Sequence, residues 1–145
     1  MANSVIEFEV LDNNRFAMLV RVFNALRTAK QSLAFPHEEY WRGFLDQDAL
    51  SRFWWPTEQE LREWEQRWNS TPVSRRFNDP ALRRPWHFGS MLDALKEGEH
   101  ELLACERVAQ IGRLEFRPLA GPFGGTDALK ALIEAFGFRV TGEIE

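Results

Sequence analysis

Alternation of apolar and polar side chains at both ends of the chain is the feature that most constrains its fold. Near the N-terminus, the stretch VIEFEVLD directs Ile6, Phe8 and Val10 to one side and Glu7 and Glu9 to the other. The stretches RLEFRPL and FRVTGEIE, in the last third of the chain, alternate in the same way. A period of two is typical of a strand that has one face on a core and one face in water. These stretches therefore predict a half-buried sheet.

Segments with a helical period separate the predicted strands. Asp12, or one of the two asparagines after it, can cap a helix whose apolar stripe includes Leu19, Phe23 and Leu26. A second stripe runs through DALKALIEAF and ends at Gly137. The stretches HELLACERV and RLEFRPL, joined by AQIG, are typical of a β-hairpin. We expect the order strand, helix, helical segment, strand, strand, helix, strand.

Without the middle segment this order is βαββαβ, and it resembles the ferredoxin-like sandwich, an α+β fold with an antiparallel sheet and helices on one face. The resemblance is one of topology and covers residues 4–30 and 99–145. It implies that the first and third strands are central and adjacent, and that the fourth strand pairs with the first. Residues 31–98 then form a Trp-rich helical insert within one domain, residues 1–145. A topology with so many uses implies almost nothing about function.

Capping and helix-ending residues divide the insert into short helices. Pro36 suits the first turn of one of them. The stretch from Thr57 to Glu60 has the form of a capping box, and the helix after it places two tryptophans on one face. Gly98 is expected to end the last helix of the insert in a left-handed conformation.

Composition and charge exclude several classes of protein. A hydrophobic fraction of 44% is typical of a globular domain, and a net charge of -4 argues against nucleic-acid binding. The single cysteine, Cys105, permits no internal disulfide. We see no leader peptide and no apolar run near the roughly 20 residues that a membrane helix needs. We therefore expect a soluble, cytoplasmic protein that does not bind a membrane.

The residue types that usually carry chemistry do not form a known arrangement. His37 lies in HEEYW, which lacks the second histidine of the H-E-x-x-H zinc motif, and His87 and His100 have no metal-ligand spacing. Cys105 lies in a predicted strand, where a thiol is an apolar filler. We predict no catalytic residue, no bound metal and no cofactor.

The glycine-rich stretch GPFGGTD precedes the last predicted helix. Backbone N–H groups at a helix start can bind an anion, and Gly124, Gly125 and Thr126 are the candidates here. The stretch lacks the lysine of a P-loop, and Asp127 already brings a negative charge to the first turn. We expect a chain reversal capped by Thr126 or Asp127, with the anion site as the weaker alternative.

The outward face of the sheet is expected to be charged. It carries no stacking aromatics, which argues against an RNA-recognition sheet. Arginines beside carboxylates are typical of cross-strand pairs, while a cation site and a two-fold dimer face are the alternatives. The side chains expected there are Glu7, Glu9, Glu115, Arg117, Arg139, Thr141 and Glu143.

The segment from Arg52 to Trp86 is the most informative part of the chain. Aromatic anchors flanked by arginines are typical of protein interfaces and also of surfaces that stack bases. The opposing interpretation is that the tryptophans bury the insert against the core. The candidate binding residues are Trp54, Trp55, Arg75, Arg76, Arg83, Arg84, Trp86 and His87.

These observations favour a non-catalytic interaction module that acts as a homodimer or adaptor through the insert. One alternative is a small-ligand binder or enzyme with a pocket between insert and sheet, in which His37, Glu38 and His87 supply polar groups. It predicts that His87 converges with a carboxylate in one cavity. The other is weak single-stranded nucleic-acid binding through residues 75–84, with a steep salt dependence.

Overall fold

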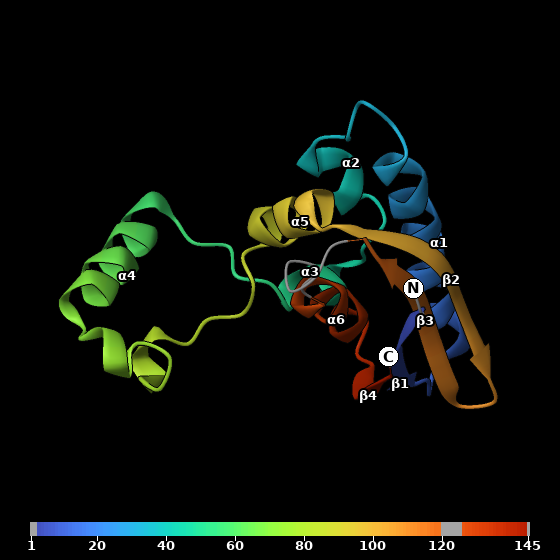
Figure 1. The fold of residues 1–145 in the computed structure, drawn as a ribbon. Helices are drawn as coiled ribbons and strands as arrows, with labels where there is room; N and C mark the ends of the chain where they lie inside the picture. Colours follow the sequence, from blue (N-terminus) through green and yellow to red (C-terminus); the bar gives the residue numbers. More distant parts are fainter. Residues whose placement is uncertain (1–2, 120–125, 145) are drawn as a thin grey trace.

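Four strands and six α-helices form a mixed α+β structure in the part of the chain that the computed structural model describes, residues 3–119 and 126–144 (Figure 1). The sheet is antiparallel throughout. In chain order the elements are β1 (Ser4–Glu9), α1 (Asn13–Lys30), α2 (Glu38–Arg42), α3 (Gln47–Ser51), α4 (Glu58–Ser70), the 3₁₀ turns η1 (Val73–Arg75) and η2 (Pro80–Leu82), α5 (Phe88–Glu97), β2 (His100–Val108), β3 (Ile111–Pro118), α6 (Asp127–Ala135) and β4 (Arg139–Ile144).

The strands lie in the order β2-β3-β1-β4. The first and third strands are therefore central and adjacent, and the fourth pairs with the first, as expected from the order of elements. In the register of β1 and β3, Ile6 faces Leu114 and Phe8 faces Gly112. Ile6, Phe8 and Leu114 are fully buried, which confirms the predicted inward face of both strands.

Helices α1 and α6 contribute the apolar stripes that cover this face. Asp12 caps α1 by accepting a hydrogen bond from the backbone N–H of Arg15. Leu19 and Phe23 of α1 and Leu129 and Ile133 of α6 are all buried in the same core. The expected helix periods are therefore confirmed for α1 and α6.

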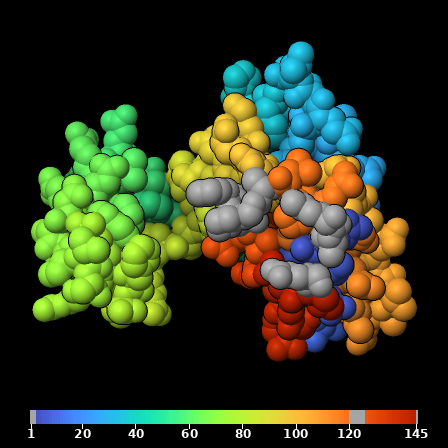
Figure 2. Space-filling model, viewed as in Figure 1, coloured from blue at the N-terminus to red at the C-terminus, as the bar shows by residue number. Residues whose placement is uncertain are grey.

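The insert divides into two parts that behave differently. Helices α2, α3 and α5 join the core through buried side chains such as Trp41, Ala49, Phe88 and Met91. Helix α4 and the two 3₁₀ turns instead stand away from the rest of the molecule, at the left of Figure 1. The space-filling view shows the same projection as a separate lobe on a narrow connection (Figure 2).

Arg15 joins three elements that come from distant parts of the chain. Its Nε donates to the carbonyl of Phe136 at 2.7 Å, at the end of α6. Its two terminal nitrogens donate to the carboxylate of Asp46 at 2.7 and 3.2 Å, and one lies 3.3 Å from the Asp48 carboxylate at the start of α3. The hydrogen bond from Arg15 lowers the pKa of Asp46. This contact fixes α3, and with it the start of the projecting part, against α1 and α6.

Two expectations about β4 are wrong because the strand contains a bulge. Its register against β1 shifts between Glu7 and Phe8, so that Ile6 faces Glu143 and Val5 faces Ile144. One extra residue reverses the direction of the side chains that follow it. Ile144 is therefore 47% exposed instead of facing the core, and Glu143 pairs with Lys130 of α6 at 2.9 Å instead of lying on the outward face.

The expected left-handed conformation of Gly98 is also wrong. Its φ is -60°, and the helix that ends with a left-handed glycine is α6, at Gly137 with φ 88°. A glycine is needed at position 98 because its neighbours leave no space for a side chain. A Cβ there would lie 2.8 Å from Nε2 of His100 and 3.0 Å from the carbonyl oxygen of Ala94.

Gly112 is the glycine of the sheet where an added side chain would clash most severely with the core. A Cβ at Gly112 would lie 2.3 Å from the ring of Phe8, which fills the centre of the core. We expect Gly112→Ala to lower the free energy of unfolding by about 2–4 kcal/mol, because Phe8 must leave its rotamer or the strands must separate. Urea denaturation measures the change. Gly142→Ala is the matched control, since a Cβ there meets nothing within 4 Å, and equal losses in the two variants would contradict the steric explanation.

Candidate interaction surface

The projecting part begins and ends at one place in the body. The backbone N–H of Trp54 donates to the carbonyl of Trp86 at 2.9 Å, and Trp54 and His87 form an isolated bridge. We call residues 54–87 the arm. Figure 1 shows that its two connections meet beside the body, one leading to α4 and the other returning to α5. The arm is therefore an insertion whose two ends lie next to each other.

Tryptophans hold the arm together from inside. Trp64 stacks on Trp68 with ring centroids 5.3 Å apart, and Trp54 lies 5.9 Å from Trp64. Trp64 Nε1 donates to the carbonyl of Leu82 at 3.0 Å, and Leu82 is buried beneath it. The capping box of Thr57 is present as predicted. This small cluster lets the arm keep its shape although no residue of α4 is buried.

The four candidate arginines of the arm divide into two pairs. Arg76 donates to the carbonyls of Trp68 and Thr71, and Arg84 donates to the carbonyl of Ala81, while each also lies over a tryptophan ring. Arg75 and Arg83 are exposed, and within the described ranges neither guanidinium has a hydrogen bond or ion pair. Among the described residues, every guanidinium donor of Arg75 and Arg83 is therefore free, whereas one nitrogen of Arg76 and one of Arg84 are already engaged.

Two apolar side chains at the end of the arm were missed by sequence reasoning. Val73 is 70% exposed and Phe77 is 81% exposed, and the Phe77 ring meets the edge of Trp68 at 5.7 Å. We call Val73, Arg75 and Phe77 the tip patch. Their segment has no periodicity, so nothing in the sequence distinguishes them from buried residues. The one signal that the sequence offered was that two apolar residues, Val73 and Phe77, lie four positions apart within an arginine-rich loop.

The remaining candidates lie at the root of the arm. Trp55 belongs to the body, because it stacks on Phe88 and its Nε1 donates to the carbonyl of Leu50 at 2.8 Å. His87 caps α5 by accepting from the N–H of Ser90 at 3.3 Å. Trp86 is 39% exposed. We call the hollow beside it the root groove, about 250 Å³, which is lined by Arg52, Phe53, Pro85, Trp86, Ala131, Glu134 and Ala135.

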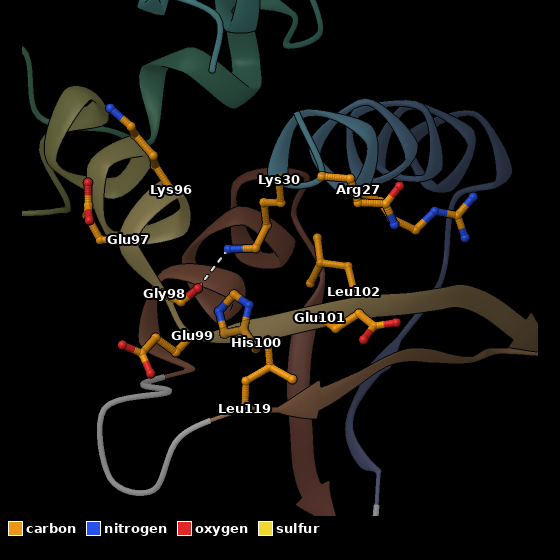
Figure 3. A pocket seen from close by; sticks show the side chains of 11 residues that line it. Arg27, Lys30, Lys96, Glu97, Gly98, Glu99, His100, Glu101, Leu102 and Leu119 are labelled. Atoms are coloured by element: carbon orange, nitrogen blue, oxygen red, sulfur yellow. Dashed lines mark hydrogen bonds between the residues drawn. The ribbon is translucent and has the colours of Figure 1, made fainter. Parts of the chain in front are cut away.

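A second cavity of about 660 Å³ lies where α1 and α5 end and β2 begins (Figure 3). Lys30 reaches from α1 and donates to the carbonyls of Leu95 and Gly98 at 2.5 and 2.9 Å. The ring of His100 lies beneath it, while the guanidinium of Arg27 points away from both (Figure 3). The polar groups of this cavity therefore do not converge on one point.

His100 is the buried titratable group of this cavity. It is 3% exposed, and its Nδ1 has no hydrogen-bond partner among the described residues. Burial, and then the positive charge of Lys30, lower the pKa of His100 to about 4. Burial also lowers the pKa of Lys30. Because the Lys30 ammonium already satisfies two carbonyls at the end of α5, its role here is structural.

The other chemical candidates do not gather in the root groove or in the cavity at His100. His87 and Glu38 both lie beside Gly89, yet neither lines the root groove or the cavity at His100. Burial, and then the charge of Glu106, raise the pKa of the Cys105 thiol to about 12, which leaves it unreactive. No three histidine, cysteine or acidic side chains of residues 3–119 and 126–144 gather as metal ligands would.

The outward face of the sheet carries cross-strand ion pairs. Arg139 lies 3.1 Å from Glu9, and Arg113 lies 3.8 Å from Glu7. These pairs match the interpretation in which arginines neutralise the carboxylates. Arg117 pairs with Glu101 in the same way.

The glycine-rich stretch is described only at its end. Gly124 and Gly125 lie outside the described residues. Thr126 is the N-cap residue of α6, but its hydroxyl caps no backbone N–H and lies 3.3 Å from the Glu143 carboxylate instead. The side-chain cap expected from Thr126 is therefore wrong, because the bulge in β4 brings Glu143 to this side of the sheet.

No protein-family model, curated protein or solved structure matches this chain. Among the helices that the structure describes, none has the length and apolar character that crossing a membrane requires.

The arm is expected to unfold without the body when its cluster is broken. Trp64→Ala removes the stack on Trp68 and the hydrogen bond to Leu82, which are the main contacts inside the arm. Hydrogen exchange should become at least about tenfold faster in α4, while β1 and β3 keep their protection. Arg62→Ala, on the same helix, is the control. Loss of protection in the sheet as well would show that arm and body fold as one unit.

The buried His100 predicts a pH dependence of stability. Its pKa is about 4 in the folded chain and 6.5 in a free side chain, so the unfolded chain takes up a proton first as the pH falls. The free energy of unfolding should therefore fall between pH 6.5 and 4, by at most about 3 kcal/mol. Urea titrations at successive pH values measure this slope. His100→Phe should flatten it, and an unchanged slope would assign it to other groups.

Proposed function

We propose that this protein is a non-catalytic interaction module that binds a protein partner through the arm, as a homodimer or an adaptor. One observation carries the proposal: the arm extends away from the body (Figure 1), buries no residue of α4, and exposes Phe77 and Val73 to solvent. Exposing these apolar side chains does not stabilise an isolated chain, because each Å² of apolar surface left in water costs about 25 cal/mol relative to burial.

The residues at the tip are of the kinds that anchor protein interfaces. An aromatic ring supplies apolar area at low conformational cost, and arginine is enriched at such positions. Of the tryptophans predicted as anchors, Trp54 supports the arm from inside, Trp55 packs on the body, and Trp86 is 39% exposed at the root. The proposal keeps Arg75 and Trp86 and adds Phe77 and Val73. The predicted set was Trp54, Trp55, Arg75, Arg76, Arg83, Arg84, Trp86 and His87.

A small-ligand site is the second candidate, favoured by the cavity at His100. Its volume lies in the range of small-molecule pockets. It is the weaker candidate because Lys30 is already bonded to the backbone. Nucleic-acid binding has only the free guanidinium groups of Arg75 and Arg83 to support it.

The finer assignment of the fold is also a proposal. We propose that the α+β sheet layer is ferredoxin-like, which is supported by the order β4-β1-β3-β2 and by the hairpin of β2 and β3. A soluble, cytoplasmic protein is supported by the single cysteine, which is a free and buried thiol.

Photo-crosslinking in the cells that make the protein tests the function. A benzophenone side chain at position 73 should give covalent adducts, and the same group at position 108 should not, although Val108 is equally exposed on the β2–β3 hairpin. Phe77→Ser should abolish the adducts while it changes the free energy of unfolding by less than about 1 kcal/mol. Adduct yields at position 73 no higher than at position 108 would reject the arm as a binding surface.

A further inference from the structure

We propose that the partner of the arm is a second copy of this chain, whose root groove receives the tip patch in a reciprocal two-fold clasp. The inference rests on the proposed function of the arm and adds the identity of its partner. The chain carries both an exposed aromatic anchor within the arm and an open groove at the root of the arm.

The root groove has the size and lining that an aromatic side chain requires. Trp86 supplies its exposed aromatic surface, because Phe53 is only 5% exposed, and Ala131 and Ala135, one turn apart on α6, leave the space open. Its volume of about 250 Å³ is enough for one phenyl ring and leaves no room for a second element. Phe77 of another copy therefore fits the groove as a single anchor.

The arm cannot fill the groove of its own chain. The groove is lined by Pro85 and Trp86, which belong to the arm's own root, whereas Phe77 lies in the lobe that stands away from the body (Figures 1 and 2). The hydrogen bond between Trp54 and Trp86 fixes the two connections together. Pro56 and Pro85 restrict the backbone of both connections. A tip patch can therefore reach a root groove only on another molecule.

Charge favours the same pairing. Arg75 of the tip patch is exposed, and Glu134 at the edge of the groove is exposed, and neither has an ion-pair partner among the described residues. Arg52, the other charged residue of the groove, already lies 3.3 Å from Asp48. The groove thus offers one unpaired carboxylate to a tip that brings one unpaired guanidinium beside its aromatic anchor.

Two-fold symmetry allows two such contacts to form at once in one dimer. A tip in a groove is a contact between two different surfaces, and it would propagate into a filament if it did not close. Because each groove lies at the root of an arm, a two-fold axis lets both tips seat at once with the arms side by side. The dimer then buries two such contacts, which is twice the area of a single tip in its groove.

Mass measurement on the purified full-length chain is the first test. Light scattering and sedimentation equilibrium from about 1 to 100 µM should give twice the chain mass of 17.0 kDa for the natural sequence. Phe77→Ser should give the monomer mass. Val108→Ser, which removes an equally exposed apolar side chain outside the arm, should leave the dimer intact.

Two further sets of variants test the pairing itself. Arg75→Glu and Glu134→Arg should each weaken association by about tenfold, and the double variant should restore it. Phe77→Ser lacks a tip and Ala131→Arg blocks the groove, so each alone should be monomeric. Mixed together they should associate, because the intact tip of one copy fits the intact groove of the other. Circular dichroism and urea unfolding verify that each variant folds.

The outcomes separate this inference from the proposed function. A natural chain that stays monomeric to 100 µM, a dimer that persists in Phe77→Ser, or a mixture that does not associate would each overturn the clasp. If position 73 nevertheless crosslinks to a protein of different mass, the arm is a binding surface for another partner. If position 73 gives no adducts, both proposals fail together.

Discussion

The bidentate contact between Arg15 and Asp46 is the interaction on which the arrangement of the molecule depends. Arg15 lies on α1, Asp46 caps α3, and the same guanidinium binds the carbonyl at the end of α6. The sheet layer by itself needs only apolar stripes on two helices. The direction in which the chain leaves that layer is fixed by this charged contact, because α3 leads directly into the root of the arm.

The body and the arm are stabilised in different ways. In the body, Phe8 packs over Gly112 and helices from both halves of the chain share one core. In the arm, stacked tryptophans and arginines bonded to carbonyls support a helix that buries nothing. Tryptophan and arginine side chains thus support the arm from inside, and Val73, Arg75 and Phe77 are the side chains that the proposed interface uses.

The features that could be predicted correctly from the sequence are those that depend on local patterns of residues. Strand alternation, the cap at Asp12, the capping box at Thr57 and the pairing of β1 with β3 and β4 were all predictable, since each depends on a few neighbouring residues or on the order of elements. The direction of Glu143 toward α6 was not predictable, because one bulge in β4 reverses the alternation. A bulge is decided by pairing between strands and leaves no mark in the pattern.

Other errors have the same origin in distant contacts. Gly98 was expected to relieve backbone strain, whereas it makes room for the ring of His100 two residues later. The candidate site was predicted only in part. Trp and Arg enrichment located the arm, but which of those residues face inward depends on how the segment after α4 folds back on it. Phe77 and Val73 are exposed for that reason alone.

The meeting of Trp54 and Trp86 at the root has a consequence for the history of such a chain. A segment whose two ends are joined by one hydrogen bond closes on itself, so that a short turn between these positions would leave the strands and the core helices where they are. A single insertion, deletion or replacement between these two positions could therefore add, remove or exchange the whole arm without disturbing the sheet layer. Under the proposed function, a change of arm would change the partner while the core stays the same.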